Sequence, residues 1–140
     1  MKVELTTEPN PADIEEIREG LRKHNEPFLG SVRQTDVVCY LNNVDGKKIA
    51  GLVGELWGDW LFVRYLWVDE NHKKGGLGSQ LLEKAENFAR EEGCHSSFLD
   101  TFSFQAKPFY ERHGYKVQMV LNDYPVTTKR YYLVKSLQIS

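Results

Sequence analysis

Residues 60–79 read WLFVRYLWVDENHKKGGLGS, and this stretch predicts a buried strand that leads through a glycine-rich turn into a helix. The part from Trp60 to Val68 is almost uninterruptedly apolar, which is typical of a central strand. The part from Asp69 to Gly78 is charged and rich in glycine, as expected for a loop. Apolar residues then recur at helical spacing, at Leu77, Leu81, Leu82, Ala85, Phe88 and Ala89. They predict a helix that runs to about Glu92 and ends at Gly93.

Strands and helices are also expected on either side of this stretch. The further strands are predicted at Val3–Thr6, Asp36–Asn42, Lys48–Trp57, Ser96–Thr101, Tyr115–Leu121 and Tyr131–Leu137. The further helices are predicted from Asn10-Pro11 to about His24, before a loop or broken helix over 25–34, and from Gln105 to His113. Because hairpins mix with crossovers, the sheet should be mixed and the class α+β or α/β. No linker or repeat divides the 140 residues, so a single domain over 1–140 is expected.

Composition narrows the class of protein. Eighteen basic and twenty acidic residues give a net charge of −2, which provides no general attraction to nucleic acid or to an anionic membrane. Cys39 and Cys94 are too few for a disulfide framework, and the four histidines show no metal-ligand spacing. That spacing gives no reason to expect a metal. No signal-peptide core or membrane-length apolar run is visible, so we expect a cytoplasmic protein.

The turn between the central strand and the following helix has the features of an anion site. Backbone N–H groups at a helix start are free, and the helix dipole favours negative charge there. Glycines at 75, 76 and 78 allow close approach of a bulky anion, and Lys73 and Lys74 add positive charge. The spacing fits neither a P-loop nor the dinucleotide fingerprint. A coenzyme A diphosphate and a plain glycine-rich turn remain as alternatives.

Two motifs resemble those of the GNAT superfamily of acetyltransferases. The first, Arg/Gln-x-x-Gly-x-Gly/Ala, corresponds to residues 73–78, with Lys73 in place of the usual Arg or Gln. The second, Asn-x-x-Ala-x-x-x-Tyr-x-Lys-x-Gly-Phe, corresponds to Ser103, Ala106, Tyr110, Arg112, Gly114 and Tyr115. The resemblance implies an α+β fold in three layers, with a mixed, mostly antiparallel central sheet flanked by helices and two strands splayed at the acetyl-CoA site.

The same resemblance implies an enzyme that transfers an acetyl group directly from acetyl-CoA to an amine of a small molecule or peptide. The cosubstrate would be held by the turn, by the end of the preceding strand and by one residue of the second motif: Trp67, Val68, Lys73, Lys74, Gly75, Gly76, Leu77, Gly78, Ser79 and Ser103. The family's strand splay would leave backbone groups near Trp67 and Val68 free to pair with the pantetheine arm.

Tyr110 is the candidate acid that protonates the leaving thiolate, since it occupies the tyrosine position of the second motif. Glu55 is the candidate base, on a strand face shared with Val53 and Trp57. Its rivals are the carboxylates of Asp59, Glu70 and Asp100. Arg64, unusual in an apolar strand, is expected to reach a sheet edge, pair with Glu55 or face an acidic acceptor.

The sequence also leaves alternatives of other classes. A non-catalytic acyl-CoA-binding or sensing domain would share the fold and the binding turn. An unrelated nucleotide-binding module would prefer an adenine or nicotinamide nucleotide. The loops over 25–34 and 122–129 are expected to shape the acceptor pocket. The acceptor itself is not specified, and the oligomeric state is open, a homodimer included.

Overall fold

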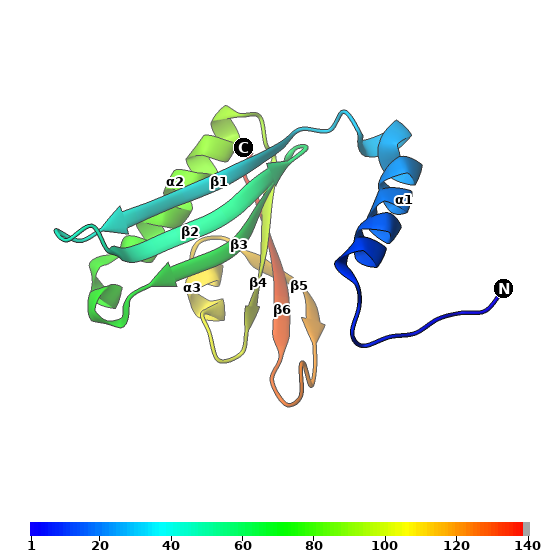
Figure 1. Cartoon of the computed structure of the whole chain (residues 1–140). Helices are drawn as coiled ribbons and strands as arrows, with labels where there is room; N and C mark the ends of the chain where they lie inside the picture. Colours follow the sequence, from blue (N-terminus) through cyan, green and yellow to red (C-terminus); the bar gives the residue numbers. More distant parts are fainter. Residues whose placement is uncertain (139–140) are drawn as a thin grey trace. The chain divides into compact units, whose positions relative to one another are not determined.

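The computed structural model describes residues 1–138 (Figure 1). It divides into two compact units, Met1–Val32 and the chain from Arg33 onward.

The first unit contains a single helix, α1, from Pro11 to Leu29. It begins where the sequence predicts, because the Asn10 side chain accepts a hydrogen bond from the Ala12 N–H at 2.9 Å. The predicted strand at Val3–Thr6 is wrong, since that segment is irregular and Val3 and Leu5 are exposed.

The predicted end of α1 near His24 is also wrong, because the helix continues for five more residues. Arg22 forms ion pairs with Glu19 at 2.6 Å and with Glu26 at 3.1 Å, and the second pair spans the expected end point. Pro27 lies in the last turn of the helix. The stretch over 25–34, expected to be a loop or a broken helix, is helical to Leu29, and only the few residues between Leu29 and the first strand form a loop.

The second unit is built on a six-stranded sheet in the order β1-β2-β3-β4-β6-β5. Its strands are β1 Gln34–Asn42, β2 Lys48–Trp57, β3 Trp60–Val68, β4 Ser96–Phe102, β5 Lys116–Leu121 and β6 Arg130–Ser136. Every neighbouring pair is antiparallel except β3 and β4, which are parallel. The prediction of a mixed, mostly antiparallel sheet is confirmed.

Three helical segments accompany the sheet: the 3₁₀ helix η1 (Glu70–Gly75), α2 (Leu77–Glu91) and α3 (Lys107–Arg112). The α2 helix packs on the face of β1, β2 and β3 that lies behind these strands in Figure 1. Alternate residues of β2 point to that face and are fully buried, among them Ala50, Leu52 and Leu56. They meet Leu82 and Ala85 of α2 in the hydrophobic core.

A bulge and a splay interrupt the middle of the sheet. Between β2 and β3 the register passes from Gly54↔Val63 to Val53↔Tyr65, which leaves Arg64 as the extra residue of a β-bulge. Between β3 and β4 the pairing stops at Val63↔Leu99, although β3 continues to Val68. The ends of the two strands diverge in Figure 1, as the resemblance implies.

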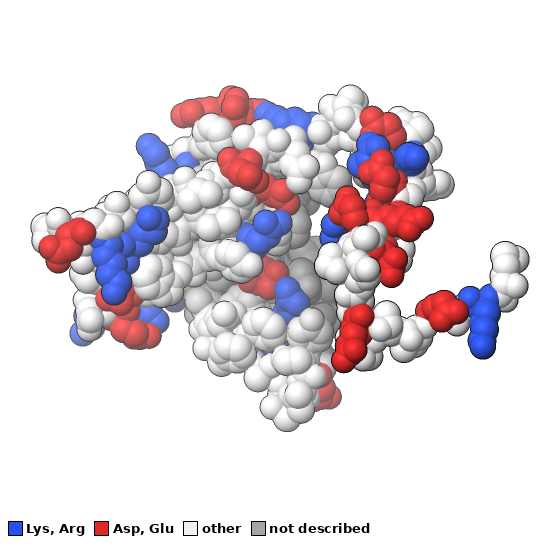
Figure 2. Space-filling view, viewed as in Figure 1, with Lys and Arg blue, Asp and Glu red and all other residues white. Residues whose placement is uncertain are grey.

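On the face shown in Figure 2, Lys and Arg side chains are interspersed with Asp and Glu side chains. This mixture agrees with the small net charge of −2. No helix in the described part of the chain combines the length and the apolar character that crossing a bilayer requires.

Candidate active site

A cleft of about 450 Å³ opens where β3 ends and α2 begins, and we call it the turn cleft. Six of the predicted cosubstrate residues line it: Trp67, Val68, Lys73, Gly76, Gly78 and Ser79. Its opposite wall comes from the segment between β4 and α3 and from α3 itself, with Phe104, Gln105, Ala106, Phe109 and Tyr110. Of these wall residues, the sequence predicted only Tyr110 as a site residue.

The first turn of α2 presents free backbone donors at this cleft. Gly76 precedes the helix with φ +71°, a left-handed conformation that suits glycine, and no side chain caps the helix. The first N–H that bonds back to the cap is that of Gln80, which donates to the Gly76 carbonyl at 3.1 Å. The amides of residues 77–79 precede it and have no carbonyl partner within the helix. An anion is the ligand that such a helix start favours.

Positive charge lies beside these amides. Lys73 lines the turn cleft, and its Nζ donates to Glu70 Oε1 at 2.8 Å. This exposed ion pair is of a kind that contributes little stability, so Lys73 can turn to an incoming phosphate at small cost.

Four predicted cosubstrate residues do not line the cleft: Lys74, Gly75, Leu77 and Ser103. The Leu77 side chain packs against the hydrophobic core, so its contribution to the turn is its amide. Ser103 holds a neighbouring loop instead. Its Oγ accepts from the Lys129 N–H at 3.2 Å, and its N–H donates to the Lys129 carbonyl at 2.9 Å.

A second cleft of about 780 Å³, the strand cleft, lies between the diverging ends of β3 and β4. Its own walls include Phe62, Arg64, Tyr65, Asp100, Phe102 and Arg130. It shares five residues with the turn cleft: Leu66, Trp67, Gln105, Ala106 and Tyr110. The two clefts therefore meet, and Tyr110 stands where they join.

Tyr110 is buried, with 7% of its surface exposed. Its hydroxyl makes no hydrogen bond to any group within residues 1–138. The hydroxyl oxygen is not fully enclosed by protein, so a ligand can reach it. Burial, with a smaller contribution from the Asp100 carboxylate, raises the pKa of Tyr110 to about 12. The phenol therefore stays protonated at neutral pH, and its hydrogen is available to a ligand in the clefts.

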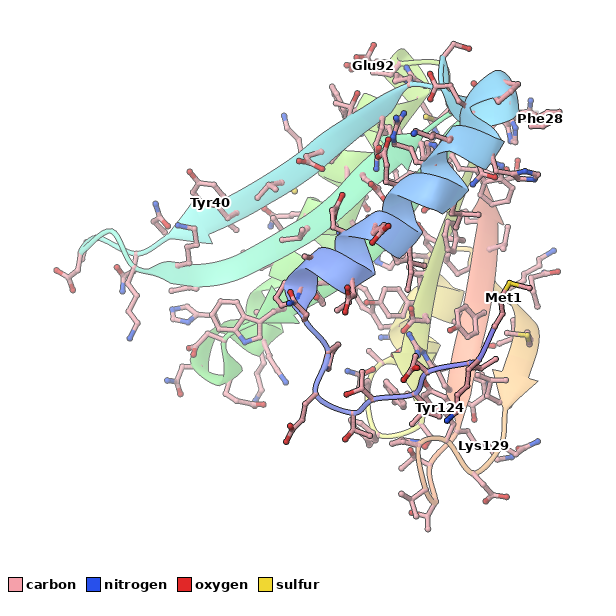
Figure 3. All side chains as sticks on the ribbon, turned by 45° about the vertical axis from the view of Figure 1, so that its right-hand side comes forward. Met1, Phe28, Tyr40, Glu92, Tyr124 and Lys129 are labelled. Carbon is pink, nitrogen blue, oxygen red and sulfur yellow. The ribbon has the colours of Figure 1, made fainter. Side chains whose placement is uncertain are left out.

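Asp100 and Arg130 form an ion pair on one wall of the strand cleft, at 3.1 Å. The guanidinium also donates to the Tyr124 hydroxyl at 3.1 Å and lies 5.3 Å from the centre of that ring. The hydrogen bond to Asp100 raises the pKa of Arg130 above its usual range. Tyr124 and Lys129 belong to the loop between β5 and β6 and are labelled in Figure 3. None of residues 122–129 lines either cleft, but Tyr124 contacts Arg130, which lines the strand cleft.

Glu55 lies beside the bulge and not in either cleft. One of its oxygens accepts from Gln34 Nε2 at 2.9 Å, and the other lies 3.3 Å from Arg64 Nη2. Of the three roles expected for Arg64, pairing with Glu55 is thus confirmed, and the same guanidinium lines the strand cleft.

Among the other carboxylates considered for the base, only Asp100 lines a cleft. Glu70 is paired with Lys73, and Asp59 lies in the tight turn between β2 and β3. Residues 1–138 contain no group of three or more His, Cys, Asp or Glu side chains arranged to hold a metal ion.

Comparisons with known proteins agree with this geometry. The model of the acetyltransferase (GNAT) family matches residues 3–115. The blasticidin-S acetyltransferase of Streptomyces morookaense is 40% identical in an alignment of 121 residues that covers 79% of this chain and 89% of that protein. The crystal structure of an acetyltransferase from Bacillus cereus superposes with a TM-score of 0.85 at 32% identity, covering 95% of this chain and 97% of that one.

One structural relative contains the expected cosubstrate. A Bacillus anthracis protein described as a streptothricin acetyltransferase was crystallised in complex with acetyl coenzyme A, and it superposes with a TM-score of 0.64. It is 17% identical and covers 73% of this chain and 62% of its own, so it supports the fold alone. The family match and the identity to the curated and crystallised relatives are sufficient for the assignment: the chain belongs to the GNAT family of acetyltransferases and is an acyltransferase.

Proposed function

We propose that this enzyme transfers the acetyl group of acetyl-CoA directly to an amine of a small molecule or peptide, within a single domain over residues 1–140. The observation that carries the proposal is the meeting of two clefts at Tyr110, one beside a helix start with free amides and the other between splayed strands. Two substrates that enter from the two clefts would have their reacting groups beside the same phenol. Direct transfer requires this proximity.

In this proposal the turn cleft takes the donor. The diphosphate accepts from the amides of 77–79 and from Lys73, whose charge complements it. The pantetheine arm then follows β3, whose backbone beyond Val63 has no strand partner on the β4 side within residues 1–138. Its amides would pair with the groups near Trp67 and Val68 as an added strand does.

The strand cleft takes the acceptor amine. A lysine-like amine has a pKa near 10.4, and bringing it to the neutral, nucleophilic form at pH 7 costs about 4–5 kcal/mol. Glu55 is the proposed base, acting on the amine through water beside Arg64, and Asp100 is its rival within the cleft. Glu55→Gln and Asp100→Asn distinguish the two, because the variant that lacks the base loses the acidic limb of the pH–rate profile.

Tyr110 acts on the leaving group. A phenol with pKa about 12 is a much weaker acid than a thiol with pKa near 8.5, so complete proton transfer to a free thiolate would be unfavourable by about 5 kcal/mol. The proposed role is therefore a hydrogen bond from neutral Tyr110 to the sulfur as negative charge develops on it.

The acceptor is best sought among small-molecule amines, starting with blasticidin S, because the curated relative at 40% identity bears that name. The experiment is a panel that contains blasticidin S, polyamines, aminoglycosides, amino acids and peptides, with acetyl-CoA as donor and detection of the free thiol. We expect amine-dependent thiol release and an N-acetylated product by mass spectrometry. Tight coenzyme binding without thiol release for any amine would favour the sensing domain instead. Stronger binding of an adenine or nicotinamide nucleotide than of coenzyme A would favour the nucleotide module.

A further inference from the structure

A histidine that lines neither cleft contacts Ser79, a residue of the proposed phosphate site. His113 Nε2 lies 2.8 Å from Ser79 Oγ, although the two residues are 34 positions apart in the chain. Ser79 is in the first turn of α2 and lines the turn cleft. His113 ends α3, and its N–H donates to the Tyr110 carbonyl at 3.0 Å. The contact thus joins the helix start that would hold the diphosphate to the helix that carries Tyr110.

The packing around this contact restricts the position of the imidazole. A Cβ atom added to Gly78 would lie 3.3 Å from Phe109 Cζ, so α2 approaches α3 closely at a residue without a side chain. The Phe109 ring in turn packs against the His113 ring, with 4.8 Å between their centres. The close approach at Gly78 brings Ser79 within reach of His113, and Phe109 supports the imidazole on one side.

The effect of this contact on a bound phosphate depends on which of three groups can donate a hydrogen bond: the Ser79 hydroxyl, the His113 imidazole and the phosphate itself. A serine hydroxyl has one hydrogen to donate, whereas a phosphate oxygen only accepts. If His113 Nε2 lacks a hydrogen, Ser79 must donate to it and turns only lone pairs toward the phosphate. If Nε2 carries the hydrogen, Ser79 accepts from His113 and its own hydrogen is free for the phosphate.

We propose that His113 is a positioning residue for the cosubstrate: it carries hydrogen on Nε2 and orients the Ser79 hydroxyl as a donor to the diphosphate of acetyl-CoA. This inference rests on the proposed function, which places the diphosphate at the start of α2. Either the neutral Nε2–H tautomer or the imidazolium satisfies it, since both donate from that nitrogen.

The test is the variant His113→Phe, which keeps a ring beside Phe109 and removes the donor. We expect the Kd of coenzyme A to rise roughly 3- to 10-fold, as for one lost hydrogen bond, and KM for acetyl-CoA to rise more than kcat falls. Binding of acetylpantetheine, which lacks the diphosphate, should not change. His95→Phe is the matched control, because His95 makes a similar 2.8 Å contact with Ser96 Oγ outside both clefts.

Two further measurements complete the test. In a Ser79→Ala background, His113→Phe should have no further effect on coenzyme A affinity, because the hydroxyl that it orients is absent. Nitrogen NMR of the wild-type complex should show hydrogen on Nε2 of His113, and this readout needs no variant to fold. A bare Nε2 in the complex, additive effects of the two substitutions or an equal loss for acetylpantetheine would each overturn the proposal. If the wild-type protein binds no coenzyme A, the proposed function fails as well, whereas normal binding that is insensitive to His113 rejects this inference alone.

Discussion

At the scale of single residues, Tyr110 shows how the surroundings alter a side chain that the motif identifies. The motif suggests a phenol of ordinary acidity, but burial and the nearby Asp100 carboxylate raise the pKa of Tyr110 to about 12. The group therefore remains a neutral hydrogen-bond donor through the pH range in which amines lose their proton. In the proposed mechanism, Tyr110 therefore contributes a directed hydrogen bond more than a transferable proton.

Replacing Tyr110 with Phe should lower kcat by about 10- to 100-fold, which corresponds to a hydrogen bond of ~1.5–3 kcal/mol to a charged atom. The Kd of acetyl-CoA should stay close to the wild-type value, since the aromatic ring and its packing are kept. Saturation kinetics and calorimetric titration measure the two quantities. Tyr40→Phe, at an exposed position of β1, serves as control, and unchanged turnover in the Tyr110 variant would remove the residue from the mechanism.

At the scale of elements, the bulge between β2 and β3 accompanies the splay that forms the strand cleft. Along β3, more exposed and buried residues alternate up to Val63. The bulge then makes Arg64 and Tyr65 two consecutive exposed residues. Gly54 lies opposite the bulge, and a Cβ atom there would overlap the carbonyl oxygen of Phe62. The absence of a side chain at this position is therefore needed for the close approach of the two strands.

Gly54→Ala should lower the free energy of unfolding by about 1–3 kcal/mol, because β3 must move to accommodate the methyl group. It should also weaken acetyl-CoA binding, since the moved strand carries Trp67 and Val68. Gly51→Ala in the same strand is the matched control, because a Cβ atom added there would have its nearest neighbours at 3.6 Å, an ordinary contact distance. Urea unfolding of both variants measures the difference, and equal effects would contradict the steric argument.

At the scale of the whole molecule, a buried polar network joins α2 to the far part of the sheet. The Tyr115 hydroxyl donates to Glu86 Oε2 at 2.8 Å and lies 2.8 Å from Ser97 Oγ. The other Glu86 oxygen accepts from Lys135 Nζ at 2.7 Å. Glu86 and Tyr115 are each only 1% exposed, and burial raises the pKa of Tyr115 far above its usual range. The core thus holds two tyrosines, Tyr110 and Tyr115, in their neutral form.

Raised tyrosine pKa values predict a loss of stability at alkaline pH. An unfolded tyrosine ionises near pH 10, whereas folded Tyr110 ionises near 12, so its stabilisation is complete below pH 10 and is lost between about 10 and 12. The loss approaches ~1.4 kcal/mol per pH unit in this window. Between pH 9 and pH 11 the free energy of unfolding of Tyr110→Phe should therefore fall by about 1.4 kcal/mol less than that of the wild type. Parallel curves from urea unfolding would contradict the burial argument.

How much could be predicted from sequence depended on the range of the interactions. The hairpin strands, the turn and α2 were predicted near their observed bounds, because alternation, helical spacing and glycine act over a few residues. The strand predicted at Val3–Thr6 failed for the opposite reason, since an alternating pattern forms a strand only when another strand pairs with it. The end of α1 was misplaced because the Arg22–Glu26 ion pair favours a continued helix across the expected end near His24.

By itself, the sequence determined the family, the glycine-rich turn before α2 and the tyrosine of the second motif, because each depends on residues close together in the chain. Only the tertiary structure decided that two clefts meet at that tyrosine and that Arg64 pairs with Glu55. It also brought His113 within hydrogen-bond distance of Ser79 and made Phe104 and Gln105 part of the wall of the turn cleft. These contacts depend on where strands stop pairing and how closely helices approach, and such distances are set by the packing of residues remote in sequence.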